Sequence, residues 1–219
     1  MKSEKLYFSY KYFPEISYES YILEFYVNGK DLCELKEGYD ETEKLTDIYF
    51  TADKFKNSLK EILNTPFPCE KLKIKKEKGD TVFELIKKAD ALYWDKGFEL
   101  DLEEFWLLYD WKYNHCLTSV NIELCPMVYF SAIEDKIEIT WKSDKKFKNE
   151  KGIYYVSKEL FKAEVLKFIE IMFERREIVE QKLDLVVING KKISAKRNYD
   201  IEMEFEDQML EELKNVNYN

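Results

Sequence analysis

Glycine and proline are scarce in this sequence, with six and four residues respectively among 219. A phosphate-binding cradle of the Gly-rich type needs several glycines close together, and a long flexible linker is normally rich in glycine or serine. The sequence therefore excludes Gly-rich nucleotide-binding loops and long flexible linkers between domains.

Cysteine and histidine are also few, and no hydrophobic run is long. The four cysteines have no C-x-x-C spacing, and a single histidine cannot build a His-rich zinc site. The N-terminal stretch MKSEKLYFSYKYF lacks the apolar core of an export signal, and no apolar run approaches the roughly 18 residues of a membrane helix. We therefore expect a cytoplasmic protein with reduced thiols, no metal, no cofactor and no membrane contact.

Charge, in contrast, is plentiful and mostly acidic. Lys and Arg number 35 against 44 Asp and Glu, which gives a net charge of -9. Such a field repels phosphate backbones and attracts basic proteins, so we expect no nucleic acid and a basic protein partner. Hydrophobic residues make up 45% of the chain, which is enough to bury a core. We expect a single domain over residues 1–219, with at most a weak subdivision near residues 70–80, at the basic connector KLKIKKEKG.

The clearest structural pattern lies in the later part of the chain. The stretch MVYFSAIEDKIEITW alternates apolar and polar residues on both sides of Glu134-Asp135, which predicts two antiparallel strands joined by a tight turn. Residues 152–156 predict a third short strand. Ser157 then has the position of an N-cap for a long amphipathic helix that ends near residue 180.

The N-terminal part predicts strands. Residues 1–17 are aromatic and Lys-rich and form either a first strand or an ordered arm. Asn28-Gly29 is the strongest two-residue turn signal and predicts a hairpin. The buried face of this hairpin is expected to carry Tyr21, Leu23, Phe25 and Val27. The stretch LTDIYF, residues 45–50, predicts a further strand.

Three helices are predicted in the middle of the chain. Thr51 is expected to cap the helix ADKFKNSLKEILN. Its apolar stripe consists of Phe55, Leu59, Ile62 and Leu63. Thr81 and Glu84 have the spacing of a capping box, and Asp101 and Glu104 repeat this spacing before LEEFWLLYDW. The inward face of this last helix is expected to consist of Leu102, Phe105, Trp106 and Tyr109.

Two stretches leave two alternatives open. Residues 112–125 contain SVNIEL, which alternates like a strand but is too short to distinguish strand from loop. Residues 183–199 fit either a hairpin around Asn189-Gly190 or a helix end followed by a loop. The segment DIEMEFEDQMLEELKNV then returns to helical spacing. The order of segments predicts an α+β fold, with a mostly antiparallel sheet and several helices packed against it.

Few residues combine into a catalytic pattern. His115 and Cys116 are neighbours, but adjacent residues on a strand point apart, and a nucleophile–base pair needs a hydrogen bond. We favour a buried thiol beside an unrelated histidine. The carboxylate pairs Glu103-Glu104 and Glu211-Glu212 could supply the acid and base of a glycoside hydrolase. Solvated helix faces explain these pairs more simply. The basic stretch KSDKKFKNEK, which contains Phe147, is expected to be an ordinary solvated loop.

An acidic stretch with interleaved aromatic residues is the strongest candidate for a binding surface. Its members are Trp94, Asp95, Phe98, Glu99, Asp101, Glu103, Glu104 and Asp110. Dense carboxylates steer a basic partner, and rings beside them supply anchors. The alternative is an ordinary helix with its rings in the core and its charges in water, which we expect for most of these residues. A second acidic stretch, residues 200–212, has the same two interpretations.

Four stretches span most of residues 20–180. They are YILEFYVNGKDLCEL, TADKFKNSLKEILNTPFP, CPMVYF leading to ITW at Trp141, and GIYYVSKELFKAEVLKFIEIMF. In order and spacing they resemble an uncharacterised family of bacterial proteins that are encoded near toxin genes and are thought to act as immunity proteins. The resemblance implies this class of role and assigns no site residue.

The sequence therefore favours an immunity or inhibitor protein that binds a basic toxin domain through an acidic surface containing aromatic residues. The first alternative is a non-catalytic structural domain that self-associates through an exposed aromatic face. The second is a carboxylate-based hydrolase with an unfamiliar site. The sequence leaves the partner's activity and the oligomeric state open.

Overall fold

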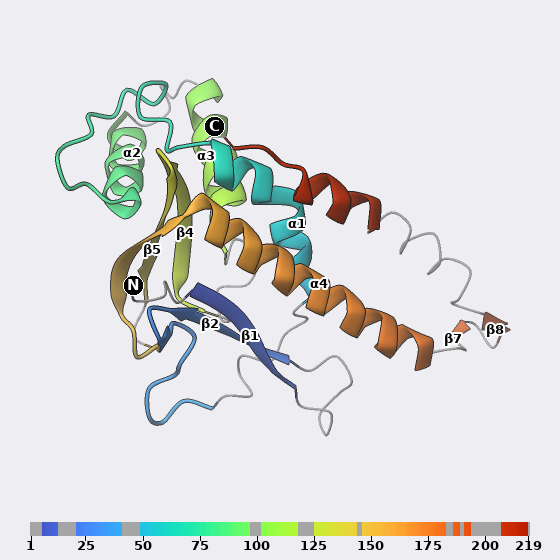
Figure 1. Cartoon of the computed structure of the whole chain (residues 1–219). Coiled ribbons are helices and arrows are strands. Elements are labelled where there is room, and N and C mark those ends of the chain that lie inside the picture. Colours follow the sequence, from blue (N-terminus) through green and yellow to red (C-terminus); the bar gives the residue numbers. More distant parts are fainter. Residues whose placement is uncertain are drawn as a thin grey trace.

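A computed structural model of the chain shows two three-stranded sheets with helices packed around them, and a further two-stranded pair (Figure 1). The structure describes residues 6–12, 21–40, 49–96, 102–117, 125–143, 146–182, 186–188, 191–193 and 207–218, with the backbone alone for residues 49–50, 93–96, 175–182, 186–188 and 191–193. All strand pairings in these ranges are antiparallel, so the fold is α+β as predicted.

The first sheet contains the predicted N-terminal hairpin. Its strands, in the order β1-β2-β3, are Leu6–Tyr12, Tyr21–Val27 and Lys30–Asp31. Asn28 and Gly29 have φ values of 51° and 77°, as a tight turn with two left-handed residues requires. The predicted inward residues Tyr21, Leu23, Phe25 and Val27 are all buried. The first strand, which was one of two alternatives for residues 1–17, pairs with β2 along its whole length.

The second sheet is the predicted three-stranded unit. Its strands, in the order β4-β5-β6, are Met127–Ile133, Lys136–Lys142 and Lys151–Ser157. The turn between β4 and β5 lies at Glu134-Asp135, and Glu134 has a φ of 51°. Helix α4, Lys158–Lys182, follows β6 directly. The amide of Leu160 donates to Oγ of Ser157 at 3.3 Å, which confirms the predicted N-cap.

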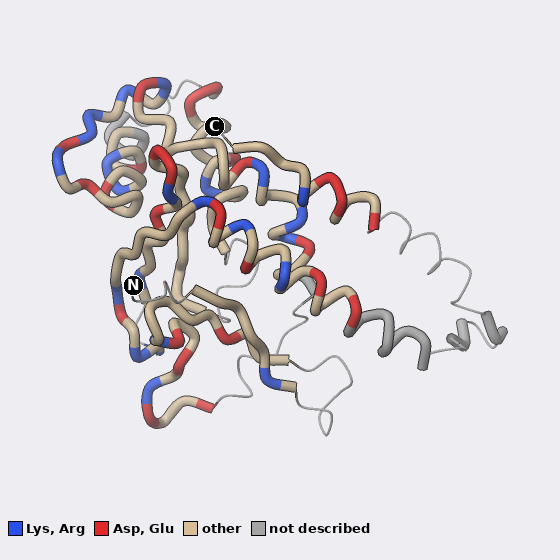
Figure 2. Tube along the Cα trace, in the orientation of Figure 1, with Lys and Arg blue, Asp and Glu red and all other residues tan. Residues whose placement is uncertain are grey.

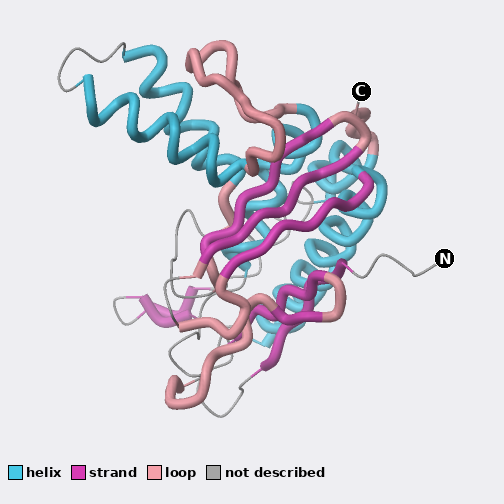
Figure 3. Tube along the Cα trace, turned by 90° about the vertical axis from the view of Figure 1, so that its left-hand side faces the viewer, coloured by secondary structure: helices cyan, strands magenta, loops and turns pink. Residues whose placement is uncertain are grey.

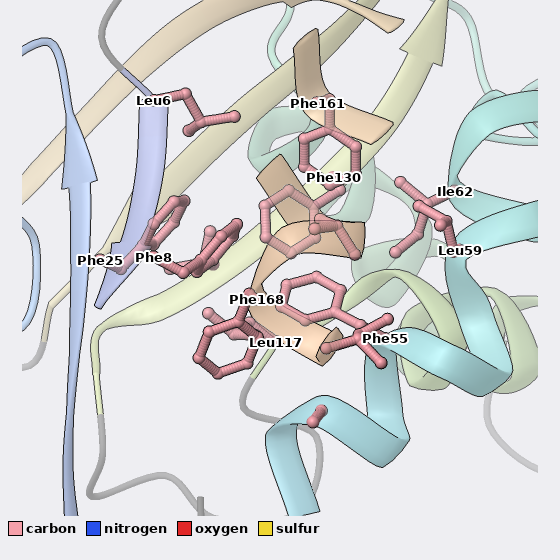
Figure 4. Close-up of a cluster of buried hydrophobic side chains, with 14 of the residues drawn as sticks. Leu6, Phe8, Phe25, Phe55, Leu59, Ile62, Leu117, Phe130, Phe161 and Phe168 are labelled. Atoms are coloured by element: carbon pink, nitrogen blue, oxygen red, sulfur yellow. The ribbon is translucent and has the colours of Figure 1, made fainter. Parts of the chain in front are cut away.

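The main core lies between the two sheets and the helices α1 (Tyr49–Asn64) and α4. Phenylalanine rings from several of these elements meet there, as Figure 4 shows. Ring centroids of Phe55 and Phe130 lie 5.8 Å apart, and those of Phe130 and Phe161 lie 5.1 Å apart. The helix at residues 207–214 adds Leu210 and Leu213 to this core. Several phenylalanines of the chain thus contribute to the packing of this core.

A second, smaller core lies on the other face of the second sheet. It is formed with α2 (Val82–Lys96) and α3 (Leu102–His115). Strand β4 alternates between the two cores, because Val128 and Phe130 face the main core while Tyr129 faces the second. In Figure 3 the long strands accordingly run between helices on both sides.

The basic loop before β6 is a structural connection between the two sheets, so the prediction of a solvated loop tip was wrong for Phe147. This ring is 2% exposed and forms an isolated bridge with Leu35. The amide of Lys36 donates to the carbonyl of Lys146 at 3.0 Å, and the amide of Lys148 donates to the carbonyl of Glu34 at 2.8 Å. The loop is held by strand-like pairing, which composition did not indicate.

The start of α1 also differs from the prediction. Tyr49 and Phe50 belong to the helix, so the strand predicted over residues 45–50 is wrong at its last two residues, and the rest lies outside the described ranges. Thr51 is buried inside the first turn and is not the cap. Aromatic residues favour strands only weakly, and the burial of the helix face that follows outweighs this preference.

The open stretches are partly settled. Residues 112–115 end α3, Cys116 makes an isolated bridge with Tyr129, and 118–124 lie outside the described residues. Within residues 183–199, the described parts favour the hairpin alternative, because Val186–Ile188 (β7) pairs with Lys191–Ile193 (β8). The other residues of this stretch lie outside the described ranges. Among the helices of the described ranges, none combines the length and apolarity that crossing a bilayer requires.

Candidate protein-binding surface

Helix α2 is anchored at its first turn by three polar contacts. The amide of Thr81 donates to Glu84 at 2.8 Å, and the amide of Glu84 lies 3.4 Å from Oγ1 of Thr81, as the predicted capping box requires. The amide of Val82 donates to Oε1 of Glu138 on β5 at 2.7 Å. Burial raises the pKa of Glu138, because a desolvated carboxylate is costly even at a helix N-terminus. These contacts fix α2 to the second sheet.

Helix α3 is attached to α2 and to the loop before it. Nζ of Lys112 lies 3.0 and 3.1 Å from the two carboxylate oxygens of Asp90 on α2. Lys73, in the basic connector, donates to Glu104 in the first turn of α3. In Figure 2 the connector passes between the region of α3 and the outer side of α2, and it carries several basic positions. The orientation of α3 is therefore set by its neighbours as well as by its own apolar residues.

The inward face of α3 is built around Trp111. Its Nε1–H donates to the carbonyl of Pro66 at 3.1 Å. Its ring stacks on that of His115, with centroids 4.2 Å apart, and meets Phe67 edge-on at 4.9 Å. Leu108 is buried on the same face. This face packs on the second core and was not the one predicted from the sequence.

His115 is a structural residue of this face. Nδ1 lies 2.9 Å from the carbonyl of Trp111 and Nε2 lies 3.1 Å from the carbonyl of Thr65. Burial lowers the pKa of His115 to about 4, so the ring is neutral at pH 7. Both ring nitrogens face main-chain oxygens, so neither is directed at the thiol of Cys116. The geometry favours packing over a nucleophile–base pair.

The outward face of α3 is exposed, and this corrects the sequence-based prediction. Leu102, Phe105, Trp106 and Tyr109 were expected to face inward. The exposed fractions are 70% for Leu102, 39% for Phe105, 54% for Trp106, 53% for Tyr109 and 46% for Tyr113. We call these five residues the aromatic face of α3. The helix LEEFWLLYDWKYNH carries apolar residues around most of its circumference, so spacing alone could not select the buried side.

The rings of the aromatic face contact one another. Centroids of Phe105 and Trp106 lie 5.5 Å apart, those of Trp106 and Tyr109 lie 5.7 Å apart, and those of Phe105 and Tyr109 lie 6.5 Å apart. Edge-to-face and stacked rings at these distances attract one another. The exposed rings therefore form an ordered cluster, which lowers the entropy lost when a partner immobilises them.

Lys54 supports the C-terminal end of this face from α1. Its ammonium lies 3.8 Å from the centroid of the Tyr113 ring and donates to the carbonyl of the same residue. Burial lowers the pKa of Lys54 to about 8. Sequence analysis missed both residues. The available signal was the spacing of Tyr113, four residues after Tyr109, which continues the exposed row.

The predicted acidic residues fall into three groups. Glu103 and Asp110 are exposed on α3, seven residues apart and therefore on one side of the aromatic face. Glu104 is engaged by Lys73. Trp94 and Asp95 lie in the last turn of α2, with side chains outside the described part of the chain. Phe98, Glu99 and Asp101 lie outside the described residues altogether.

Other candidate sites do not converge. On the helix at residues 207–214, the acidic residues are exposed and Lys214 pairs with both Glu211 and Glu170, which fits a solvated face. Glu104 and Glu211 each have a lysine partner, so ion pairs account for one member of each proposed carboxylate pair. Within the described ranges, no group of three or more potential metal ligands comes together. The four cysteines, all described, form no disulfide.

Comparisons of the chain with protein-family models, with curated proteins and with solved structures found no match.

Proposed function

We propose that this protein is a non-catalytic inhibitor that binds a basic bacterial toxin domain, as an immunity protein does, and that the aromatic face of α3 is its contact surface. The observation that carries the proposal is the exposed cluster of Phe105, Trp106 and Tyr109. Contiguous apolar patches on soluble proteins mark interaction sites. Trp and Tyr are the residues that most often dominate the free energy of binding.

Charge supports a basic partner. The chain has a net charge of -9, and Glu103 and Asp110 lie beside the aromatic face. Domains that act on nucleic acid carry basic active sites, and an acidic inhibitor meets such a site with complementary potential. Exposed aromatic anchors with adjacent carboxylates provide both binding energy and steering. The sequence resemblance to proteins encoded near toxin genes gives the same role.

Self-association through the same rings is the second candidate function. The exposure of Trp106 and Tyr109 is the observation in its favour. Sedimentation at micromolar concentration distinguishes the two candidate functions. A dimer that Tyr109→Ala dissociates supports self-association, whereas a monomer supports binding of a different protein.

The direct test is co-expression with the C-terminal toxin domain of a secreted protein encoded beside the gene for this chain. We expect the wild-type chain to restore growth and the double variant Trp106→Ala, Tyr109→Ala to fail. Tyr39→Ala, which removes an exposed ring outside the aromatic face, is the matched control and should protect fully. Equal killing with and without the wild-type chain would overturn the proposal for that pair.

A further inference from the structure

The exposed residues of α3 follow the spacing of a helix–helix contact. Leu102, Trp106, Tyr109 and Tyr113 occur at i, i+4, i+7 and i+11, which alternates steps of four and three residues. This is the a/d pattern by which one helix packs along another. It covers the length of α3, whose 14 residues extend for about 21 Å.

Two apolar stripes on one helix require two packing partners. The stripe of Leu108, Trp111 and His115 is buried against the second core. The opposite stripe is exposed along its whole length. An apolar stripe of a helix is normally buried against another element. The outer stripe is therefore shaped for a second helix, which the described part of this chain does not supply.

The edges of the outer stripe differ in charge. Glu103 and Asp110 each follow a stripe residue and form one edge. On the other edge lie Phe105 and Lys112, and Lys112 is paired with Asp90. The stripe thus has one acidic edge and one largely uncharged edge, and edge charges decide which helix can pack on it.

A second copy of this chain meets the acidic edge poorly. In an antiparallel pair related by a twofold axis, equivalent edges face each other, so Asp110 and Glu103 of one copy would lie against the same carboxylates of the other. In a parallel pair the acidic edge would face the edge of Phe105 and Lys112, where the lysine is already paired with Asp90. The net charge of -9 on each copy adds to the repulsion.

We infer that the outer stripe of α3 binds an amphipathic helix of the partner, with Lys or Arg along the side that meets Asp110 and Glu103. The inference rests on the proposed function for its biological partner and identifies the partner's docking element. Aromatic and leucine anchors of the two helices interlock at the centre, and the basic residues pair with the acidic edge.

A designed peptide tests this inference without knowledge of the partner. The probe is a helical peptide of about three heptads with leucine at a and d and lysine at e and g. Two peptides serve as references: one of the same composition in scrambled order, and one with glutamate in place of lysine. Calorimetric titration of the full chain should give at least about tenfold tighter binding for the ordered lysine peptide than for either reference.

Variants of the chain separate docking from general attraction. Asp110→Lys should weaken binding of the lysine peptide by about tenfold. Glu212→Lys makes the same change in net charge on an exposed site of another helix and should have little effect. Tyr109→Ala should abolish the difference between ordered and scrambled peptides.

Equal affinity for ordered and scrambled peptides would overturn the inference, as would equal weakening by Asp110→Lys and Glu212→Lys. A dimer in sedimentation that Tyr109→Ala dissociates would assign the stripe to a second copy and would also overturn it. These outcomes are independent of the co-expression test. If the chain fails to protect cells but still binds the lysine peptide, the proposed inhibitor function is wrong and the inference of a helix-binding stripe still holds.

Discussion

The indole of Trp141 lies directly over Gly152, its cross-strand partner on β6. A Cβ atom added to Gly152 would lie 2.1 Å from Cζ2 of Trp141, far inside van der Waals contact. The glycine thus leaves the space that the indole fills, and the indole packs from there against the main core. This pair explains why a strand so rich in aromatic residues contains a glycine at this position.

We expect Gly152→Ala to destabilise the protein by about 1–3 kcal/mol, because the indole of Trp141 must leave its position. Urea denaturation measures the change. In a Trp141→Leu background the same substitution should cost much less, since the two residues are coupled. Additive effects of the two substitutions would show that the close packing is not the cause.

Substitutions on the two faces of α3 should have opposite consequences for folding. Trp111→Ala should cost about 3–5 kcal/mol, because it empties the second core and removes the hydrogen bond to Pro66. Trp106→Ala should change stability by about 0.5 kcal/mol or less, because the ring is exposed. Thermal or urea unfolding of both variants checks the orientation of the helix. A large loss for Trp106→Ala would mean that this ring is buried.

Glu138 should make stability fall as the pH rises. Burial raises its pKa above 4.5 in the folded protein, against the opposing effects of the Val82 amide, Lys76 and the Tyr155 hydroxyl. Ionisation therefore costs stability as the pH increases from 4.5 through the higher folded value. Glu138→Gln keeps a side-chain oxygen that can accept the hydrogen bond from the Val82 amide, and it cannot ionise, so it does not lose stability in this way.

The difference in unfolding free energy between Glu138→Gln and wild type should therefore grow in favour of the variant across this window and then become constant. Urea unfolding at a series of pH values measures it. Glu37→Gln, at an exposed position, is the control and should follow the wild-type curve. A constant difference at all pH values would mean that Glu138 has the same pKa in the folded and unfolded chains.

Association with a basic partner should depend on ionic strength. Because the chain carries a net charge of -9, the association rate constant should fall by at least about tenfold between low and high salt. Stopped-flow fluorescence measures the rate constant, and the dissociation rate should change far less. A rate constant that is the same at both ionic strengths would exclude electrostatic steering.

Local signals in the sequence predicted most of the elements. Asn-Gly readily adopts the left-handed backbone that a two-residue hairpin turn needs, and both Asn28 and Gly29 have positive φ values. The pair Thr81 and Glu84 caps α2, and Ser157 caps α4. Each of these signals acts within a few residues, so the physical cause is contained in the segment that was read.

The orientation of α3 and the burial of Phe147 were not predictable in the same way. Which side of α3 is buried depends on carbonyl groups of Thr65 and Pro66, which lie 50 and 45 residues from their partners. Phe147 occurs among lysines, and its burial depends on the pairing of its segment with residues 34–36, which follow β3. Both outcomes are decided by distant parts of the chain, and hydrophobic spacing carries no information about them.

The connection between the two sheets also affects how the chain is made. Glu34 pairs with Lys148, which is 114 residues later. At the usual 5–20 residues per second of translation, the ribosome needs roughly 6–23 s to deliver that partner. During this interval the segment around Leu35 lacks residues 146–148, with which it pairs in the folded protein. Mispairing with another nascent chain, or capture by a chaperone, therefore competes with correct assembly at this particular step of synthesis.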